Sequence, residues 1–392
     1  MEFIEILISH DLRISHDDTD VHILDNKVED LEGKTAEVYA RDKMRAYCNK
    51  FLSSHFENLI VLTGAGSSVG IGKTDKKGKT RTELWSSVKD YITEEKLKAL
   101  CKKIKYPYPE GEPGDIEVIL SKAEKAKEYV SGIESVIKKI KNKIKGDCSL
   151  ELPDVSSHEL FLNKITSRKL RDPRAKIFTL NYDTLFEQAA NKGITVIDGF
   201  SYGNPRSFNG TYFDYDFVVR ENSRIEKEEN YVPRVMHVYK LHGSLDWEKK
   251  DDEIIKTKEQ DVKDPLIVYP NYEKYEVSYV QPFFEMMLRF QQELRRKNIL
   301  LLVIGFSFYD KHIAAVVKEA LATNTSFRML VVSKNISDIA NVSEFKDIAQ
   351  NGNVILAADT FEEFAKFYPV PQIYQRDFLQ TKYSNKENSD EE

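Results

Sequence analysis

A short apolar run that breaks into glycines constrains this chain more than any other feature. Residues 58–63 read Asn-Leu-Ile-Val-Leu-Thr, and Gly64-Ala65-Gly66-Ser67-Ser68 follow directly. A strand buried in a parallel sheet is typically such an apolar run, and glycines after it allow a tight turn. Backbone amides in a turn of this kind form a cradle for phosphate groups. The segment therefore predicts either a strand with a nucleotide-binding loop or an ordinary strand-to-loop turn.

Two better-known phosphate-binding patterns do not fit this loop. The P-loop pattern that would end in Gly72-Lys73-Thr74 needs its first glycine at position 67, where the chain has Ser67. The dinucleotide fingerprint G-x-G-x-x-G needs its third glycine at position 69, which is Val69. A nucleotide remains the first hypothesis for the ligand, bound by a loop of another type.

Composition and charge narrow the class of protein. The chain has 392 residues, of which 41% are hydrophobic and 31% charged, and its net charge is −6. This balance argues against direct binding to nucleic acid or to a membrane surface. No run of about 18 apolar residues predicts a membrane span, and the acidic residues near the N-terminus argue against a signal peptide. We therefore expect a soluble, cytoplasmic protein.

Cysteine and histidine spacing does not indicate a metal. The three cysteines, Cys48, Cys101 and Cys148, lie far apart, and the chain has no C-x-x-C pair. A structural four-cysteine zinc site is therefore excluded on one chain. The eight histidines show no metal-ligand spacing. We expect no metal, and the sparse cysteines fit a reducing compartment.

The chain divides into an N-terminal segment, a large α/β domain and a tail. We expect residues 1–55 to form an arm that ends in a helix over 36–52, and residues 56–383 to form the domain. A helical insertion is expected at about 84–165, including one helix over 121–145 with Ile133, Val136, Ile137, Ile140 and Ile144 on one face. The acidic tail, residues 384–392, is expected to be disordered.

Apolar runs alternate with helical patterns along the domain. This alternation predicts a mainly parallel sheet with helices on both faces. Further helices are expected at about 279–297 and 311–322. The expected strands are 59–63, 175–180, 234–241, 266–269, 299–304, 328–333 and 354–358.

Four of these strands end in glycine or in polar side chains. The segments are Gly64–Ser68, Asn181–Asp183, His242–Ser244 and Gly305–Asp310. Ligands of open α/β sheets bind outside the carboxyl ends of the strands. The shared placement of the four segments therefore predicts one site, although no single motif does.

Together these segments resemble the sirtuin-like (Sir2-type) superfamily. The resemblance rests on four stretches in the same order as in that family, over roughly residues 58–360. Within the family, the chain is most similar to NAD-consuming effectors of bacterial anti-phage defence, and in particular to the sirtuin-like subunit that assembles with a HerA-like hexameric translocase ATPase. The stretches are Thr63–Ser68, Thr179–Asp183 with Glu187, Lys240–Ser244, and Gly305–Asp310 with His312-Ile313.

The resemblance implies a Rossmann-like fold and an NAD-cleaving activity. Deacetylating sirtuins carry a four-cysteine zinc module, and this chain has a helical insertion instead. Cleavage of NAD by water is therefore the better interpretation than deacetylation. An unregulated NAD hydrolase would kill its own cell, so we expect control through homo-oligomerisation and a partner ATPase. A protein ADP-ribosyltransferase or deacylase, and a non-catalytic subunit that senses NAD or ADP-ribose, remain as alternatives.

The resemblance also assigns roles to individual residues. Asn181 would orient water and a ribose hydroxyl, His242 would act as general base or ribose partner, and Asp183 would contact the nicotinamide amide. Gly64, Ala65, Gly66 and Ser67 would face the pyrophosphate. Gly305 and Ser307 would line the adenosine half, with Asn335 as a further candidate for its ribose.

Each of these residues also has a purely structural interpretation. Asn181 would serve equally well as the N-cap of the following helix, since asparagine is a favoured cap. His242 would fit a turn before Gly-Ser, and Asp310 with His312 would fit the start of a helix. Lys240 is expected to be structural or exposed. The site hypothesis therefore requires that residues at all four strand ends contact a ligand in addition to any role in a helix cap or a turn.

Overall fold

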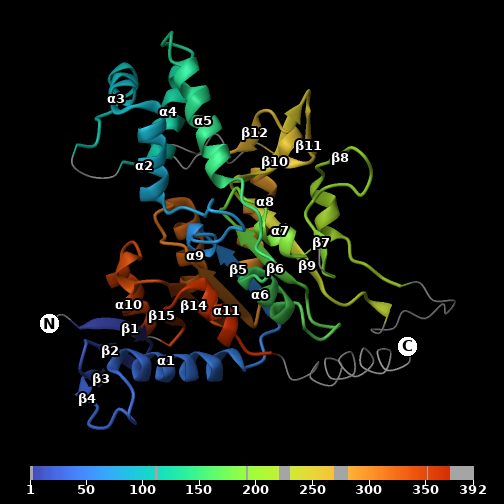
Figure 1. The fold of residues 1–392 in the computed structure, drawn as a ribbon. Helices are drawn as coiled ribbons and strands as arrows, with labels where there is room; N and C mark the ends of the chain where they lie inside the picture. Colours follow the sequence, from blue (N-terminus) through green and yellow to red (C-terminus); the bar gives the residue numbers. More distant parts are fainter. Residues whose placement is uncertain are drawn as a thin grey trace, which may run out of the picture.

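The computed structural model describes residues 3–110, 114–190, 193–219, 230–268, 281–350 and 352–370. Within these residues the main sheet has eleven strands, and those from β15 to β7 run parallel. This confirms the predicted α/β class with a mainly parallel sheet (Figure 1). The spatial order is β4 (Asn26–Lys27), β3 (Val21–Ile23), β2 (Arg13–His16), β1 (Ile4–Ile8), β15 (Val354–Ala358), β14 (Phe327–Ser333), β13 (Ile299–Ile304), β5 (Asn58–Thr63), β6 (Ala175–Thr179), β9 (Val235–Lys240) and β7 (Thr195–Ile197).

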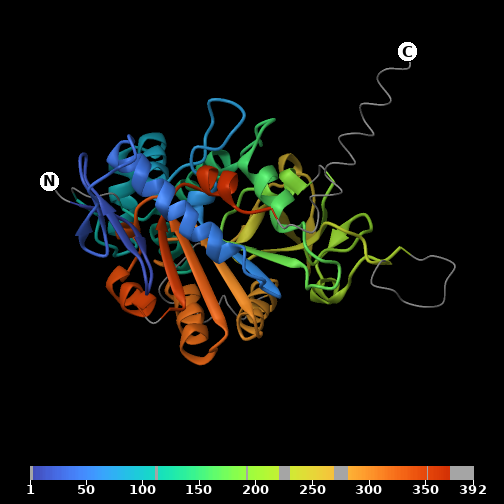
Figure 2. The same cartoon turned by 90° about the horizontal axis from the view of Figure 1, so that it is seen from below.

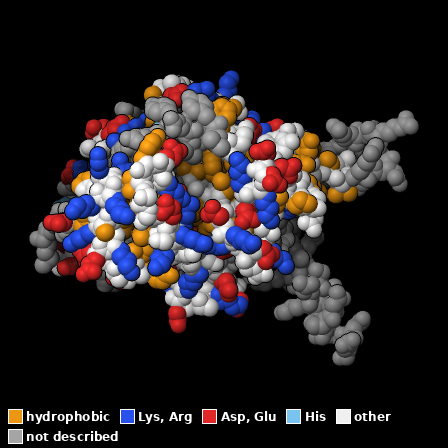
Figure 3. All heavy atoms as spheres, turned by 90° about the horizontal axis from the view of Figure 1, so that it is seen from above, with side chains coloured by type: hydrophobic (Ala, Val, Ile, Leu, Met, Phe, Trp, Pro, Cys, Tyr) orange, Lys and Arg blue, Asp and Glu red, His pale blue; other side chains and the backbone are white. Residues whose placement is uncertain are grey.

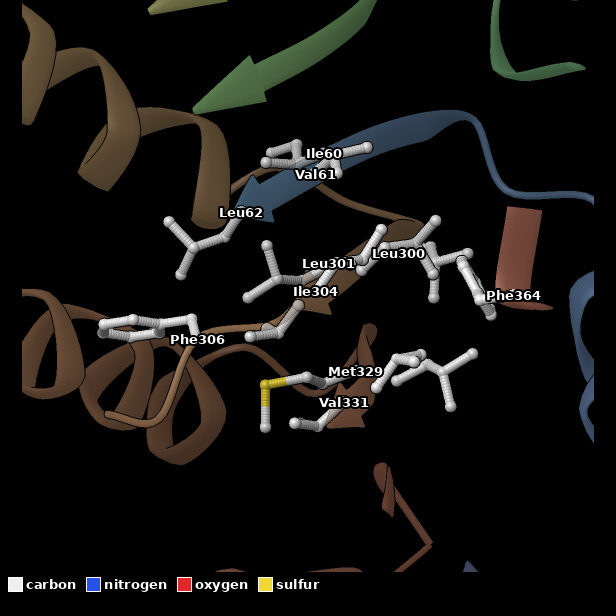
Figure 4. Packing of buried hydrophobic residues seen from close by; sticks show 14 of the residues in the cluster. Ile60, Val61, Leu62, Leu300, Leu301, Ile304, Phe306, Met329, Val331 and Phe364 are labelled. Carbon is white, nitrogen blue, oxygen red and sulfur yellow. The ribbon is translucent and has the colours of Figure 1, made fainter. Parts of the chain in front are cut away.

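Helices cover both faces of this sheet (Figure 2). On one face lie α1 (Ala36–Leu52) and α11 (Phe361–Phe367), and α11 packs against α6 (Ser157–Ile165), which in turn packs against α7 (Leu185–Ala190). On the other face lie α8 (Phe283–Leu294), α9 (Lys311–Thr323) and α10 (Val342–Gln350). Strands buried on both faces must be apolar throughout. Figure 4 shows the result, with Leu62 of β5, Leu301 of β13 and Met329 of β14 packed in the core.

The N-terminal segment is part of the sheet. We expected an arm over residues 1–55, yet β1 pairs antiparallel with β15, and β2 to β4 continue the sheet by antiparallel pairing. Leu7 and Ile14 are fully buried. The predicted helix over 36–52 is confirmed as α1, with Thr35 as its N-cap. This segment therefore covers the edge strand β15.

Four helices stand above the sheet as a separate group (Figure 1). They have their own apolar core, distinct from the main core. The single helix expected over 121–145 is wrong, because the chain reverses at Gly132, whose φ of +73° is left-handed, and two helices result. Ile133, Ile137, Ile140 and Ile144 are nevertheless buried as the pattern indicates. The four helices are α2 (Arg81–Ile92), α3 (Glu94–Lys103), α4 (Ile116–Ala126) and α5 (Glu134–Cys148).

The insertion is shorter than expected at its carboxyl end. We expected it to extend to about residue 165, but Phe161 and Leu162 of α6 lie in the main core. The insertion therefore comprises residues 81–148, from the start of α2 to the end of α5. A second sheet beyond β9 contains β12 (Pro265–Ile267), β10 (Gly243–Lys250), β11 (Glu253–Lys256) and β8 (Arg206–Ser207) in that order.

Some expectations fall on residues outside those described. These are Tyr269 and Pro270 at the end of one expected strand, residues 279–280 of one expected helix, and the tail over 384–392.

None of the helices in the described ranges combines the length and apolarity that a bilayer crossing requires.

Candidate functional site

The four polar strand ends lie side by side at one edge of the sheet. They follow β13, β5, β6 and β9, which are successive neighbours, and the registers align Ile304 with Thr63, Thr63 with Thr179, and Thr179 with Lys240. The chain passes from β5 to β6 on one side and returns to β13 on the other. The gap between β5 and β13 is therefore a topological switch point, the usual ligand position in such sheets.

Three glycines let the two loops at the switch point touch through their backbones. A Cβ on Gly66 would lie 2.6 Å from Gly305 Cα, and one on Gly64 would lie 2.8 Å from Gly305 O. Gly305 itself has a φ of +60°, and a Cβ there would lie 2.5 Å from Gly66 Cα. Both the space and the backbone conformation therefore require glycine.

The predicted phosphate cradle needs a correction, because most amides of the glycine loop are already used. The amide of Gly64 donates to Ile304 O, that of Gly66 to Gly305 O, and that of Ser67 to Gly64 O. The exposed Ala65 is different, since its amide has no hydrogen-bond partner among the described residues. Gly64, Gly66 and Ser67 thus shape the loop, and Ala65 offers the amide that a pyrophosphate would meet.

Asn181 ties the end of β6 to this loop. Its Nδ2 donates to Gly64 O at 3.0 Å, Ser67 Oγ at 3.0 Å and Ser68 Oγ at 2.8 Å. The carbonyl oxygen of Gly64 can only accept, so this contact fixes which end of the amide faces the loop. No hydrogen bond to Asn181 Oδ1 is present within the described residues. The side chain is half-buried, and its Oδ1 remains as an acceptor for a ligand.

Asp183 is occupied by local contacts. Its Oδ2 accepts from Ser68 Oγ at 2.7 Å, and its Oδ1 accepts from the amide of Leu185 at the start of α7. The residue is buried, and its carbonyl oxygen accepts a hydrogen bond from Lys240 Nζ. Lys240 is fully buried and lies 3.4 Å from Glu187 Oε1, so its predicted structural role is the one seen.

His242 forms a pair with Asp310 that joins the two outer strand ends. His242 Nε2 lies 3.2 Å from Asp310 Oδ2, and both side chains are nearly buried. Asp310 Oδ1 accepts from the amides of His312 and Ile313, so the same carboxylate caps α9. A carboxylate beside Nε2 favours the proton on that nitrogen and leaves Nδ1 as the acceptor. This is the arrangement that a general base needs.

The remaining candidates lie farther from this centre. Ser307 is half-buried, and its carbonyl oxygen accepts from the amide of Ala340. Asn335 is exposed after β14 and donates through Nδ2 to Asp338 Oδ2 at 3.0 Å. Asn335 therefore stands at the rim, one strand beyond the switch point.

Sequence reasoning missed the roles of Asp310 and Ser68. Asp310 was included in the fourth polar segment, with a helix start as its structural interpretation, but it was given no partner, and Ser68 had no assigned role, although it links Asn181 to Asp183. Both residues lie within the polar segments that follow neighbouring strands. That position was the available signal, but their partners come from other strand ends.

A cavity of about 680 Å³ lies beside α7, next to β10 and β11. Its buried lysine, Lys256, pairs with Asp198 at 2.9 Å and with Asp246 at 3.4 Å. Burial alone would raise the pKa of Asp198, but attraction to Lys256 and Arg206 outweighs this and lowers it. Glu187 and Asp246 also line this cavity and have buried carboxylate oxygens without a hydrogen-bond partner among the described residues.

Within the described residues, no group of three or more His, Cys, Asp or Glu side chains is arranged to hold a metal ion. Basic and acidic side chains are intermingled on the face seen from above (Figure 3). The strand ends offer hydrogen-bonding groups: one amide oxygen at Asn181, the His242 imidazole beside the Asp310 carboxylate, and the Ala65 amide.

The fold is that of an α/β protein whose polar strand ends lie together beside the switch point of its sheet. Residues 175–348 match the family described as the SIR2-like domain. The match begins with β6 and ends within α10, so it includes Asn181, His242 and Asp310, while the glycine loop precedes it. The match therefore concerns this part of the chain, which carries three of the four polar strand ends.

No curated protein matches the chain. Among solved structures, the chain is similar to the crystal structure of cytosolic 5′-nucleotidase IIIB bound to cytidine, at 12% identity and a TM-score of 0.30, over 84% of this chain and 90% of that one. A TM-score this low carries no information about function.

Proposed function

We propose that this protein hydrolyses NAD to nicotinamide and ADP-ribose. The observation that carries the proposal is the convergence of Asn181 with the His242–Asp310 pair at the switch point, within the SIR2-like segment. The anti-phage role and the partner named below extend this proposal by the family resemblance of the sequence.

The reaction requires an acceptor, a base and a shielded ribose. Breaking the nicotinamide–ribose bond creates an oxocarbenium-like centre, as in glycoside hydrolysis. Nicotinamide leaves with the bonding electron pair, water adds its oxygen to the ribose carbon, and one proton is released. In this proposal Asn181 Oδ1 would accept from the water or from a ribose hydroxyl, and His242 Nδ1 would accept the proton.

Substrate binding would use the surrounding loops. The Ala65 amide would face the pyrophosphate, and Gly305 with Ser307 would line the adenosine half. Asp183 already accepts from Ser68 Oγ and from the Leu185 amide, so only the remaining lone pairs of its carboxylate would be open to the nicotinamide amide. We therefore expect Asp183 to act mainly by holding the loop.

The test is to incubate the purified protein with NAD and to follow nicotinamide by chromatography. We expect release by the natural chain and a loss of at least about 100-fold in Asn181→Ala and His242→Ala. Asn26→Ala, in the exposed strand β4 at the far edge of the sheet, is the matched asparagine control and should retain most activity. If Asn181→Ala is as active as the natural chain, the site assignment is wrong.

The structure of Asn181 calls for a further control. Because its Nδ2 anchors the glycine loop, Asn181→Ala would disturb the loop as well as remove Oδ1. Ser68→Ala removes the contacts of this hydroxyl with Asn181 Nδ2 and Asp183 Oδ2, and it leaves Asn181 Oδ1 in place. We expect Ser68→Ala to be clearly more active than Asn181→Ala. Equal losses would assign Asn181 to loop anchoring alone.

We further propose that NAD depletion is the protein's output in anti-phage defence, controlled by homo-oligomerisation and a HerA-like ATPase. The assay is nicotinamide release by the chain alone and with an ATPase encoded beside it, together with NAD levels in cells under phage challenge. NAD that stays constant in challenged cells would contradict this role.

The alternatives give different products. Mass added to an acceptor protein, with nicotinamide but without free ADP-ribose, would identify an ADP-ribosyltransferase, and acyl transfer to ADP-ribose would identify a deacylase. Saturable NAD binding without turnover, alone and with the ATPase, would identify a sensing subunit.

A further inference from the structure

The insertion has its own core, yet it reaches the loops that carry the site. Glu117, in the first turn of α4, accepts a hydrogen bond from Tyr182 OH at 2.9 Å. Tyr182 stands between Asn181 and Asp183 and is 6% exposed. Its hydroxyl also lies 3.0 Å from Val268 O, but a carboxylate is the stronger acceptor for its single proton. The insertion thus holds the loop at the end of β6.

A second contact reaches the other half of the site. The guanidinium of Arg81, in the first turn of α2, lies 4.8 Å from the ring centroid of Tyr309. Tyr309 directly precedes Asp310, the partner of His242. Arg81 also pairs with Asp115 at 3.3 Å, and Asp115 caps α4 just before Glu117. One corner of the insertion therefore touches both Tyr182 and Tyr309.

The two contacts differ in strength. Tyr182 is buried, and a hydrogen bond to a charged group is among the stronger contacts of a folded chain. Arg81 and Tyr309 are both about half exposed, where a cation–π contact is weaker than a buried hydrogen bond to a carboxylate. Glu117 is therefore expected to have the larger effect.

We propose that Glu117 and Arg81 are positioning residues of the site. They hold Tyr182 and Tyr309, and through these the Asn181 loop and the His242–Asp310 pair, in the geometry for cleavage. The proposal rests on the NAD-hydrolase function for its kinetic readout. It makes the insertion a part of the site's framework, so that displacing the α2–α4 corner lowers activity without changing any residue that contacts NAD.

The kinetic test compares Glu117→Ala, Tyr182→Phe and the double variant. Small misplacements of reacting groups reduce rates by about 10–100-fold, so we expect kcat to fall at least about tenfold in each single variant, with little change in KM. The double variant should be no worse than the worse single one, because both remove the same contact. Glu117→Gln retains an acceptor oxygen and should recover most of the rate, and Arg81→Ala should lose less than Glu117→Ala.

Glu95→Ala is the matched control, since Glu95 is also an acidic residue in the first turn of an insertion helix, α3. Its activity and thermal midpoint should equal those of the natural chain. If the natural chain cleaves NAD and Glu117→Ala cleaves it equally fast, the positioning role is overturned and the function stands.

Hydrogen–deuterium exchange gives a readout that does not depend on activity. Glu117→Ala should speed exchange in peptides covering residues 179–186, and Arg81→Ala in peptides covering 305–312, while Glu95→Ala changes neither. Unchanged exchange in both loops would overturn the proposal, whether or not the natural chain cleaves NAD.

Discussion

At the scale of single residues, the site depends on side chains that serve two neighbours at once. Asn181 gives its Nδ2 to the glycine loop and keeps Oδ1 for a ligand. Asp310 caps α9 with one oxygen and faces His242 with the other. Because each of these side chains contacts two neighbours, its position is fixed without a further residue to hold it. It also means that a variant must remove one function of a side chain and keep the other.

Asp310→Asn separates the two functions of that carboxylate. Asparagine is as good an N-cap as aspartate, so the fold and the thermal midpoint should be unchanged. The amide would favour the other imidazole tautomer, as in the Asp-to-Asn variant of a serine protease triad, and we expect nicotinamide release to fall by about 100-fold or more. A fully active Asp310→Asn variant would exclude a role for this pair in catalysis.

The contact between Gly66 and Gly305 allows a stability test. Gly66→Ala places a Cβ 2.6 Å from a backbone atom that cannot move alone, and we expect a loss of roughly 1–3 kcal/mol in unfolding free energy. Gly146→Ala, in α5 with nothing within 4 Å of its Cβ, should instead gain about 0.5–1 kcal/mol. Chemical denaturation of both variants measures the difference, and equal stabilities would contradict the close approach.

Part of this site could be predicted from the types of residue that follow the apolar strands. The sequence places Asn181, His242 and Gly305 after apolar strands, and that position alone indicates a shared edge. It does not indicate that the amides of Gly64 and Gly66 donate to carbonyl oxygens of β13 and its loop. Nor does it pair His242 with Asp310, because that contact requires the register of strands far apart in the chain. Long-range pairing is the information that local patterns lack.

At the scale of secondary structure, buried parallel strands were the easiest to predict. β5, β13 and β14 are uninterrupted apolar runs, and their predicted bounds differ from the structure by a residue at most. The N-terminal strands were missed because they are short and polar on one side, and only their pairing with β15 makes them strands. β10 and β11 were missed for a similar reason, since they form a charged antiparallel hairpin beyond the main sheet.

Two alanine substitutions in β1 test whether the N-terminal segment belongs to the fold. Leu7 is fully buried, and Leu7→Ala is expected to lower the unfolding free energy by about 2–5 kcal/mol. Ile4 is 55% exposed in the same strand, and Ile4→Ala should change it by less than about 0.5 kcal/mol. Denaturant unfolding measures both. If residues 1–35 were a mobile arm, neither substitution would lower the unfolding free energy.

At the scale of the whole molecule, a buried histidine makes stability depend on pH. His158 lies between Phe186 and Phe361, which come from α7 and α11, and neither ring nitrogen has a hydrogen-bond partner among the described residues. Burial lowers the pKa of His158 from its usual 6.5 to about 3. This ring therefore joins three helices while remaining neutral.

The sign of the effect follows from proton binding. Between pH 6.5 and about 3, the unfolded chain binds a proton at His158 and the folded chain does not, so stability falls as pH falls. Between pH 7 and pH 5 this histidine contributes a loss of about 2 kcal/mol. His158→Phe should reduce the acid-induced drop in thermal midpoint over this range. An identical drop in both proteins would contradict the neutral buried state.

The products released from NAD distinguish hydrolysis from transfer to a protein. The most direct measurement is the molar ratio of nicotinamide to free ADP-ribose after the natural chain, alone or with its ATPase, has been incubated with NAD. Hydrolysis at this site predicts equal amounts of the two products, and His242→Ala should lose both together. NAD that stays intact under every condition, or nicotinamide released without free ADP-ribose, would contradict the account.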